Sequence, residues 1–460
     1  MTTDCKAGVI ALLAIAIFVG VPTFAQDNGS GSGTRGGEVR GDHDAERKEA
    51  SMEGMKHAQM HDVPRQPKTF VELITRHATS GTSAEPNSAP GAMLMTMKGG
   101  WMLMFHGVAF LNAIQQSGPR GSDRVFLTNW FMPMAQRKIG PGIFTARTMF
   151  SLEPATVTNR YYPELFQQGE TAFGKPIVDG QHPHDFVMEL AAFYDLKLGE
   201  HGLLSFYFAP VGDPAMGPSA YGHRASASED PLAPLGHHLE DSTHIADDVV
   251  TTGLTYKIMR MEASGFHGRE PDEFRWNIDS GKIDSWSIRA SVNPAPNWSV
   301  QYSFSHLTSP EALHPEEDVD RMTASAMYNR PITHGNWANT LLWGRNRTSD
   351  GLVWNGYLAE STLRFAEHNF VWGRIESTDR TNELLLRNQF EPPDFPESII
   401  GRVQAYSAGY DRDFLLPHLA IAPGAQFSIY TTPQALKAQY GSHPAGVVVF
   451  LRIRPIGKQR

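Results

Sequence analysis

Residues 297–307 read Asn-Trp-Ser-Val-Gln-Tyr-Ser-Phe-Ser-His-Leu, and their side chains alternate in character. Successive side chains of an extended strand point to opposite faces. The aromatic and aliphatic residues from Trp298 to Phe304 therefore share one face, while the serines and Gln301 share the other. This period of two predicts a strand with one apolar and one polar face. Residues 185–198, 283–292 and 354–365 repeat the pattern.

Sixteen segments from Met93 onward share this pattern and are bounded by Gly, Pro, Asn or Asp. They begin near Met93, Arg124, Gly142, Asp185, Gly202, Val249, Arg260, Ile283, Asn297, Asp320, Asn336, Trp354, His368, Arg402, His418 and Ala445. Connections after even-numbered segments are short, and those after odd-numbered segments are usually longer. This alternation predicts an all-β protein, an antiparallel transmembrane β-barrel of about 16 strands. A soluble sandwich or propeller is the alternative, but it gives no reason for connection lengths to alternate.

The composition narrows the classes of function. The 460 residues include 40 Lys+Arg and 49 Asp+Glu, and the net charge of −9 excludes a generally basic nucleic-acid binder. Cys5 is the sole cysteine, which excludes a disulfide framework and a multi-cysteine metal site. No apolar run beyond the N-terminal region is long enough for a transmembrane helix, so any membrane span has to consist of strands.

The chain divides into three parts by composition. Residues 1–25 have the basic Lys6, an apolar stretch from Ala7 to Val21 and a small residue at Ala25, which predicts a cleaved signal peptide. Residues 26–91 are predicted to form a flexible arm, first Gly/Ser-rich and then Met/His-rich, disordered and linked to the barrel. Residues 92–460 are predicted to form the barrel, and the expected location is the cell outer membrane.

The region from Met93 to Arg454 resembles bacterial outer-membrane β-barrels in general. Gly446 followed by Val449, Phe450 and Leu451 is similar to the assembly signal in the last strand of such proteins, although residues 455–460 follow it here. The resemblance implies two partners, outer-membrane lipid and the barrel-assembly machinery. Residues 165–170 and 181–185 also look similar to a group of uncharacterised exported barrel proteins.

Charged residues on the polar strand faces are candidates for the lumen lining. They are Arg147, Glu189, Arg289, Glu360, Arg364, Arg374 and Glu376. Opposed charges inside a barrel either set a field that sorts solutes or pair as structural ladders. The longest predicted outer connection, residues 211–248, contains four prolines that would stiffen it, and we expect it to fold inward and narrow the pore.

Two groups of residues could bind metal. The first, in the arm, consists of Met52, Met55, His57, Met60 and His61. Thioether sulfur selects Cu(I), and this arm resembles the Met/His-rich leader of copper-resistance outer-membrane proteins of the B type. The second group consists of His182, His184, His237 and His238, which acids accompany and which could hold zinc or copper. The alternatives are a solvated linker for the arm and a hydrogen-bonded loop plug for the histidines.

The sequence predicts a channel or porin-like protein that passes small hydrophilic solutes or ions. An outer-membrane protein for metal binding or copper resistance is the first alternative. A barrel-embedded hydrolase that uses His182, His184 and nearby acids is the second. The chain contains no GxSxG, P-loop or HExxH motif, so we expect no enzyme activity.

Overall fold

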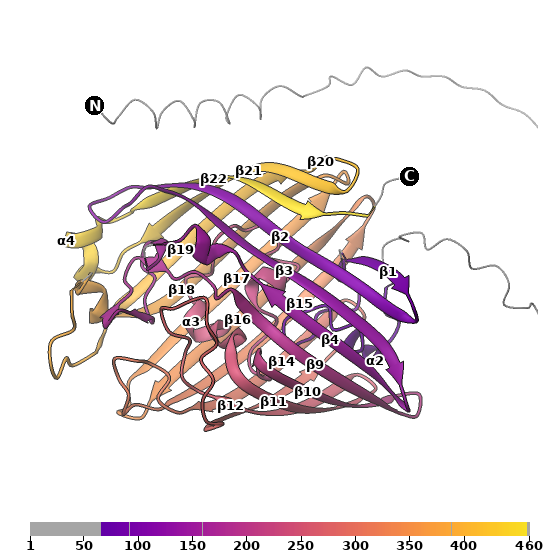
Figure 1. The fold of residues 1–460 in the computed structure, drawn as a ribbon. Coiled ribbons are helices and arrows are strands. Elements are labelled where there is room, and N and C mark those ends of the chain that lie inside the picture. The colour runs from indigo at the N-terminus through magenta and orange to yellow at the C-terminus, as the bar shows by residue number, and fades with distance from the viewer. Residues whose placement is uncertain (1–65, 92, 159, 388, 458–460) are drawn as a thin grey trace, which may run out of the picture. The chain divides into compact units, whose positions relative to one another are not determined.

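The computed structural model describes residues 66–457 apart from residues 92, 159 and 388. In this part of the chain, no helix is long and apolar enough to cross a membrane. The described residues form a closed wall of long tilted strands (Figure 1). Residues 1–65, which include the predicted signal peptide and the Met/His group of the arm, lie outside the described residues.

Sixteen of the described strands make up the wall. They are β2 (Trp101–Gln116), β3 (Arg124–Ile139), β4 (Gly142–Phe150), β9 (Val187–Leu198), β10 (Gly202–Gly212), β11 (Ala246–Tyr256), β12 (Met259–His267), β13 (Ser285–Val292), β14 (Trp298–Leu307), β15 (Val319–Ile332), β16 (Gly335–Thr348), β17 (Val353–Phe365), β18 (Asn369–Thr381), β19 (Ile399–Arg412), β21 (Leu419–Thr431) and β22 (Ala445–Pro455). Each pairs antiparallel with its neighbour along the chain.

The wall closes because the first and last of these strands also pair. Residues 109–116 of β2 lie in register with residues 446–453 of β22, from Ala109 opposite Ile453 to Gln116 opposite Gly446. A closed sheet leaves no edge strand with unpaired backbone groups. Two short strands extend the same sheet: β1 (Leu94–Lys98) pairs with β2, and β20 (Phe414–Leu415) pairs with β21.

The smaller elements lie in the connections. The short strands are β5 (Tyr162–Pro163), β6 (Thr171–Ala172), β7 (Lys175–Pro176) and β8 (Gly180–Gln181), and the α-helices are α2 (Phe70–Ile74), α3 (His237–Glu240) and α4 (Lys437–Tyr440). Helix α2 begins at Thr69, whose side chain accepts a hydrogen bond from the Glu72 backbone N–H at 3.1 Å. This helix packs against Leu203 beside the short turns, so it covers that end of the barrel.

The two faces of the wall are the reverse of those in a soluble domain. In β14, Trp298 and Tyr302 are 42% and 49% exposed, while Ser303 is fully buried. Leu341 and Ile375 are likewise exposed, and the faces behind them carry buried serine, threonine, arginine and glutamate. A large contiguous apolar surface on the outside and a polar inside match the requirement of a wall that meets lipid.

The sequence prediction of the wall is confirmed in strand number, order and face. The first segment, expected near Met93, is a hairpin in which β1 turns back into β2. One side-chain direction was wrong: the pattern placed Met188 on the outer face with Leu190, but Met188 is buried inside. The pairing of β4 with β9 shifts register between Met149 and Phe150, and this irregularity reverses the alternation locally.

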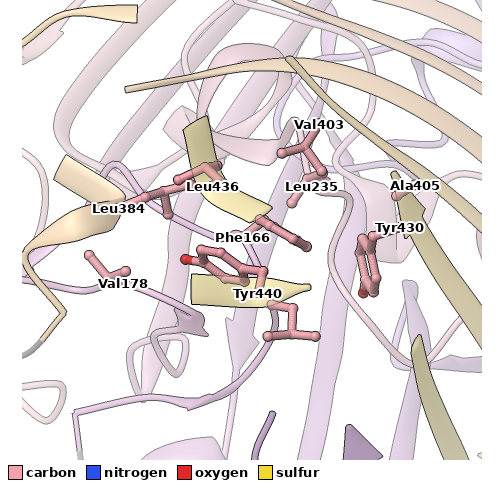
Figure 2. Packing of buried hydrophobic residues seen from close by; sticks show 10 residues of the cluster. Phe166, Val178, Leu235, Leu384, Val403, Ala405, Tyr430, Leu436 and Tyr440 are labelled. Atoms are coloured by element: carbon pink, nitrogen blue, oxygen red, sulfur yellow. The ribbon is translucent and has the colours of Figure 1, made fainter. Parts of the chain in front are cut away.

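Apolar packing is confined to small clusters inside the wall. In Figure 2, the Phe166 ring lies between Tyr430 of β21 and Tyr440 of α4, and stacks on the latter at a centroid distance of 4.3 Å. Leu235 and Leu384, from two further connections, join the same cluster. This cluster ties the long connections to one another at their end of the barrel.

Candidate functional site

Three segments that are not part of the wall place side chains in the lumen, and we call them the plug: residues 79–88, residues 151–186 apart from residue 159, and residues 213–245. Every residue from 79 to 88 is buried, and every residue from 213 to 245 is buried or half-buried. The first segment enters from the short-turn end, behind α2, and the other two enter from the long-loop end. The expectation that residues 211–248 fold inward is confirmed.

The end of the predicted flexible arm behaves differently from the expectation. Residues 66–91, assigned to the arm by their composition, pack into the barrel instead. The Arg147 guanidinium of β4 donates to the backbone carbonyls of His77, Thr79 and Gly81 at 2.7–2.8 Å. Residues 77–81 form no helix or strand, so their backbone carbonyls need other partners. The Arg147 side chain of the wall supplies them.

Arg147 also forms a buried ion pair with the wall. Its guanidinium meets the Glu189 carboxylate of β9 in a two-pronged contact at 2.5 and 2.7 Å. Tyr207 donates a further hydrogen bond to Glu189 at 2.8 Å. A fully buried charge pair of this kind is stabilised only when its remaining donors and acceptors are also paired. Here the carbonyls of His77, Thr79 and Gly81 accept from Arg147.

Arg289 of β13 anchors the plug from another part of the wall. It pairs with Glu262 at 3.0 Å and donates to the Thr82 hydroxyl at 2.9 Å and to the Gly217 carbonyl at 3.1 Å. Thr82 and Gly217 belong to two different plug segments. One wall side chain therefore holds the short N-terminal segment and the long segment together.

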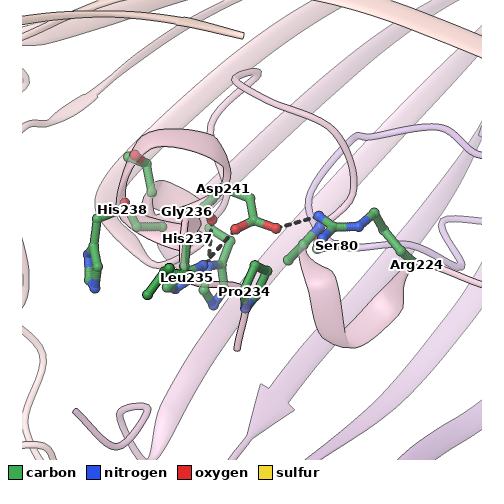
Figure 3. A network of polar contacts seen from close by, with 12 residues as sticks. Ser80, Arg224, Pro234, Leu235, Gly236, His237, His238 and Asp241 are labelled. Atoms are coloured by element: carbon green, nitrogen blue, oxygen red, sulfur yellow. Dashed lines mark hydrogen bonds and ion pairs between the residues drawn. The ribbon is translucent and has the colours of Figure 1, made fainter. Parts of the chain in front are cut away.

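The long segment carries its own arginine into the wall network. Arg224 contacts Asp241 at 2.5 Å (Figure 3). It also contacts Glu360 of β17 at 2.8 Å. Arg374 of β18 pairs with Asp230 of the plug at 3.0 Å and with Glu360 at 3.3 Å. Acidic and basic side chains of the wall and the plug therefore alternate along this network. This arrangement is the structural ladder that was one of the two alternatives predicted for the inner charges.

The seven predicted lumen residues are placed on the inner face, and six of them lie in these networks. Glu376 accepts a hydrogen bond from the Leu235 backbone N–H of the plug. Arg364 is the exception: it is half-buried near the turn and donates to the Glu367 carbonyl at 2.7 Å. In the described residues, the predicted lumen charges therefore hold the plug rather than line an open water path.

Small cavities lie between the plug and the wall, and two of them differ in their lining. The larger measures about 40 Å³, room for one or a few waters, and is lined in part by Trp130, Glu153, His184, Tyr221 and His244. The smaller measures about 10 Å³ and lies beside His238, Glu270, Glu311 and Arg321. Neither of these two cavities is a continuous passage through the part of the barrel that the structure describes.

The four predicted metal-binding histidines fall into two sets. The His184 and His237 rings each place Nδ1 against a carboxylate, Glu153 at 3.0 Å and Asp241 at 2.6 Å. His182 and His238 instead lie near Glu170, and Figure 3 shows His238 on the side of α3 away from Arg224. Burial lowers the pKa of both His182 and His238 well below the usual value.

Methionines gather at one place on the inner face. Met93, Met95, Met102 and Met104 of the first hairpin pack with Met132, Met134, Met149 and Met188. The His223 ring of the plug touches this cluster, with Nε2 3.2 Å from the Met149 sulfur. The flexible thioether chains fill an irregular space between the wall and the plug.

The plug residues that bind the wall were not predicted from the sequence. Arg224, Asp230 and Thr82 are single charged or polar residues in stretches without periodicity. The alternating pattern reports only which side of a strand a residue occupies. It gives no signal for a partner more than a hundred positions away.

Several solved structures of porins are similar to this chain. No family model and no curated protein matches the chain. Among solved structures, an anion-selective porin from Comamonas acidovorans is similar at 11% identity and a TM-score of 0.48, over 77% of this chain and 99% of that one. Pseudomonas putida OprB is similar at 10% identity and 0.47, over 77% and 94%, and Salmonella typhi OmpF in complex with daunomycin at 10% and 0.46, over 78% and 99%. At these values the architecture of this chain rests on its own strand pairing. The comparisons give no support to the copper and hydrolase alternatives.

Proposed function

We propose that this protein is a porin-like channel of the bacterial outer membrane that passes small hydrophilic solutes or ions. The observation that carries the proposal is the inverted wall. Large apolar side chains such as Tyr302 and Leu341 are exposed outside, and serine and charged residues are buried inside. A polar interior inside a lipid-facing cylinder has the character of a solute path.

The plug makes the described conformation the closed state of this channel. Many of its contacts with the wall are hydrogen bonds and ion pairs, and water can replace such contacts at small net cost. Displacement of the plug would expose the inner charges Arg147, Arg289 and Arg374 to water. These charges would then select solutes by sign.

Export and insertion complete the proposal. Residues 1–25 act as the signal that directs the chain across the inner membrane. The barrel-assembly machinery then inserts the barrel, guided by the last strand. The position of β22 supports this order, since its pairing with β2 is the step that closes the wall.

Planar-bilayer recording tests the proposal. We expect the wild-type chain to give rare, small conductance steps, because the plug occupies the lumen. The Arg147→Ala and Arg289→Ala double variant, which releases residues 79–88, should give larger and more frequent steps. Silence of both proteins, each shown to be folded and inserted in the bilayer, would overturn the channel proposal.

A further inference from the structure

We propose that the plug contains a zinc site formed by Glu170, His182 and His238. Glu170 and His182 come from residues 151–186, and His238 from α3 in residues 213–245. The inference concerns the plug itself and does not depend on whether the barrel conducts.

The three side chains already converge on one point. His182 Nε2 lies 2.9 Å from Glu170 Oε1, and His238 Nδ1 lies 3.5 Å from the same oxygen. All three candidate ligand atoms lie within 4.8 Å of one another. Ligands around a tetrahedral zinc ion, at bond lengths of about 2.0–2.2 Å, are roughly 3.3 Å apart, which these separations bracket.

The donor and acceptor roles of the two His182 ring nitrogens indicate that the cluster needs a cation. His182 Nδ1 lies 3.0 Å from the Pro183 carbonyl, which can only accept, so Nδ1 carries the proton. Nε2 of the neutral ring is then an acceptor, and it faces a carboxylate oxygen that is also an acceptor. Two acceptors at 2.9 Å need a cation between them, either a proton or a metal ion.

His238 supplies a second, independent observation. It is more than nine-tenths buried, and its Nδ1 atom has no hydrogen-bond partner among the described residues. Leaving a buried polar atom unpaired is costly. A metal ion at the point where Nδ1 faces Glu170 would satisfy this atom together with His182 Nε2.

The groups around the cluster fit a zinc site of two histidines and one glutamate. Arg275 lies 4.0 Å from Glu170 Oε2 and 3.6 Å from Asp185, so it holds the far oxygen and leaves Oε1 to the histidines. A cavity of about 10 Å³, close to the size of one water molecule, lies beside His238. Glu270, Glu311 and Arg321 also line that cavity.

Zinc at this point would join two plug segments that are otherwise separate in the chain. An ion that binds only the folded state stabilises that state in proportion to the logarithm of its concentration over its Kd. The site would therefore strengthen the closed arrangement of the plug.

Zinc binding to the full-length protein in detergent tests the proposal by calorimetry and by thermal unfolding. We expect the wild type to bind one more equivalent of Zn²⁺ than the His182→Ala, His238→Ala double variant. We also expect Zn²⁺ to raise the unfolding temperature of the wild type and to have a much smaller effect on the variant. Any ion held by the Met/His arm is common to both proteins and cancels in the difference.

Two further variants separate zinc binding from damage to the plug. Glu170→Gln keeps the shape of the side chain and should lose the same equivalent. His223→Ala removes a half-buried histidine of the same segment that touches Met149 instead of Glu170, and it should bind zinc as the wild type does. Equal stoichiometry and equal Zn²⁺-induced shifts in all four proteins, with unfolding temperatures matched in EDTA, would overturn the proposal.

Discussion

The wall and the plug of this molecule are held together by different kinds of contact. Each wall strand pairs with its neighbours through regular backbone hydrogen bonds, and its side chains alternate between lipid and lumen. The plug has few regular hydrogen bonds, and single side chains such as Arg147 and Arg289 satisfy its backbone and its charges. The strand pairing of the wall therefore rests on backbone hydrogen bonds, which do not require particular side chains, whereas the plug depends on particular side chains of the wall such as Arg147 and Arg289.

The largest effect is expected at a plug anchor. Arg147→Ala removes the hydrogen bonds to the carbonyls of His77, Thr79 and Gly81 and leaves Glu189 buried without its cation. Breaking one partner of a buried ion pair costs about 3–5 kcal/mol in the free energy of unfolding. Denaturant unfolding in lipid vesicles measures this loss. Lys138→Ala, at an exposed position of β3, is the control, and a loss at Arg147 no larger than the control would contradict the role of the anchor.

A smaller loss is expected when a charge is placed on the outer face of the wall. Leu341 lies in the middle of β16 and is 63% exposed. Leu341→Arg should cost about 2–4 kcal/mol in a bilayer, because the cation would sit near the lipid midplane. Leu341→Phe, which keeps the position apolar, should change stability little. If arginine is tolerated as well as phenylalanine in vesicles, this face does not meet lipid.

The tight fit of the plug predicts an intermediate effect at one glycine. Gly81 has a φ of +49°, and a Cβ added there would lie 2.6 Å from the Asp213 side chain. Gly99 has a φ of +57° with open space around it. Both alanine variants meet the left-handed backbone penalty, and Gly81→Ala adds overpacking of about 1–3 kcal/mol. Equal losses in the two variants by thermal unfolding would show that residue 81 is not confined.

The smallest effect concerns pH. Burial raises the pKa of Glu85, which accepts a hydrogen bond from the Ala225 backbone N–H, to about 7. An acid whose folded pKa is raised stabilises the fold below its unfolded pKa, near 4.5, and this contribution is lost as the pH rises to about 7. One such group changes the free energy of unfolding by at most about 1.4 kcal/mol per pH unit. Glu85→Gln should reduce the slope of the free energy of unfolding against pH between pH 5 and 7. An unchanged slope would show that the ionisation of Glu85 does not contribute to the pH dependence of stability.

The wall could be predicted from the sequence, whereas little of the plug could, for a physical reason. Alternation in residues 297–307 reports burial directly, because one face of each strand meets lipid and the other meets the lumen. The inward path of residues 211–248 could be anticipated from length and prolines. That of residues 79–88 could not, because a run of small polar residues has the same composition in a linker and in a packed segment.

The candidate site divides in the same way. The inner-face charges were predictable from strand parity, but their partners Arg224 and Asp230 were not. The four histidines were recognised as a group from their crowding along the chain. Only the fold shows that His182 and His238 approach Glu170, while His184 and His237 face other carboxylates.

The environment of two adjacent residues in β14 shows most directly whether the outer face of the wall meets lipid. Nitroxide labels on Tyr302→Cys and Ser303→Cys, in a chain with Cys5→Ser, report collisions with oxygen, which is soluble in lipid, and with a water-soluble nickel complex. In a closed barrel with lipid outside, the label at 302 collides mainly with oxygen and the label at 303 is shielded from lipid. A label at 302 that is sheltered from oxygen, or one at 303 that meets it more often, would contradict a closed barrel with lipid on its outer face.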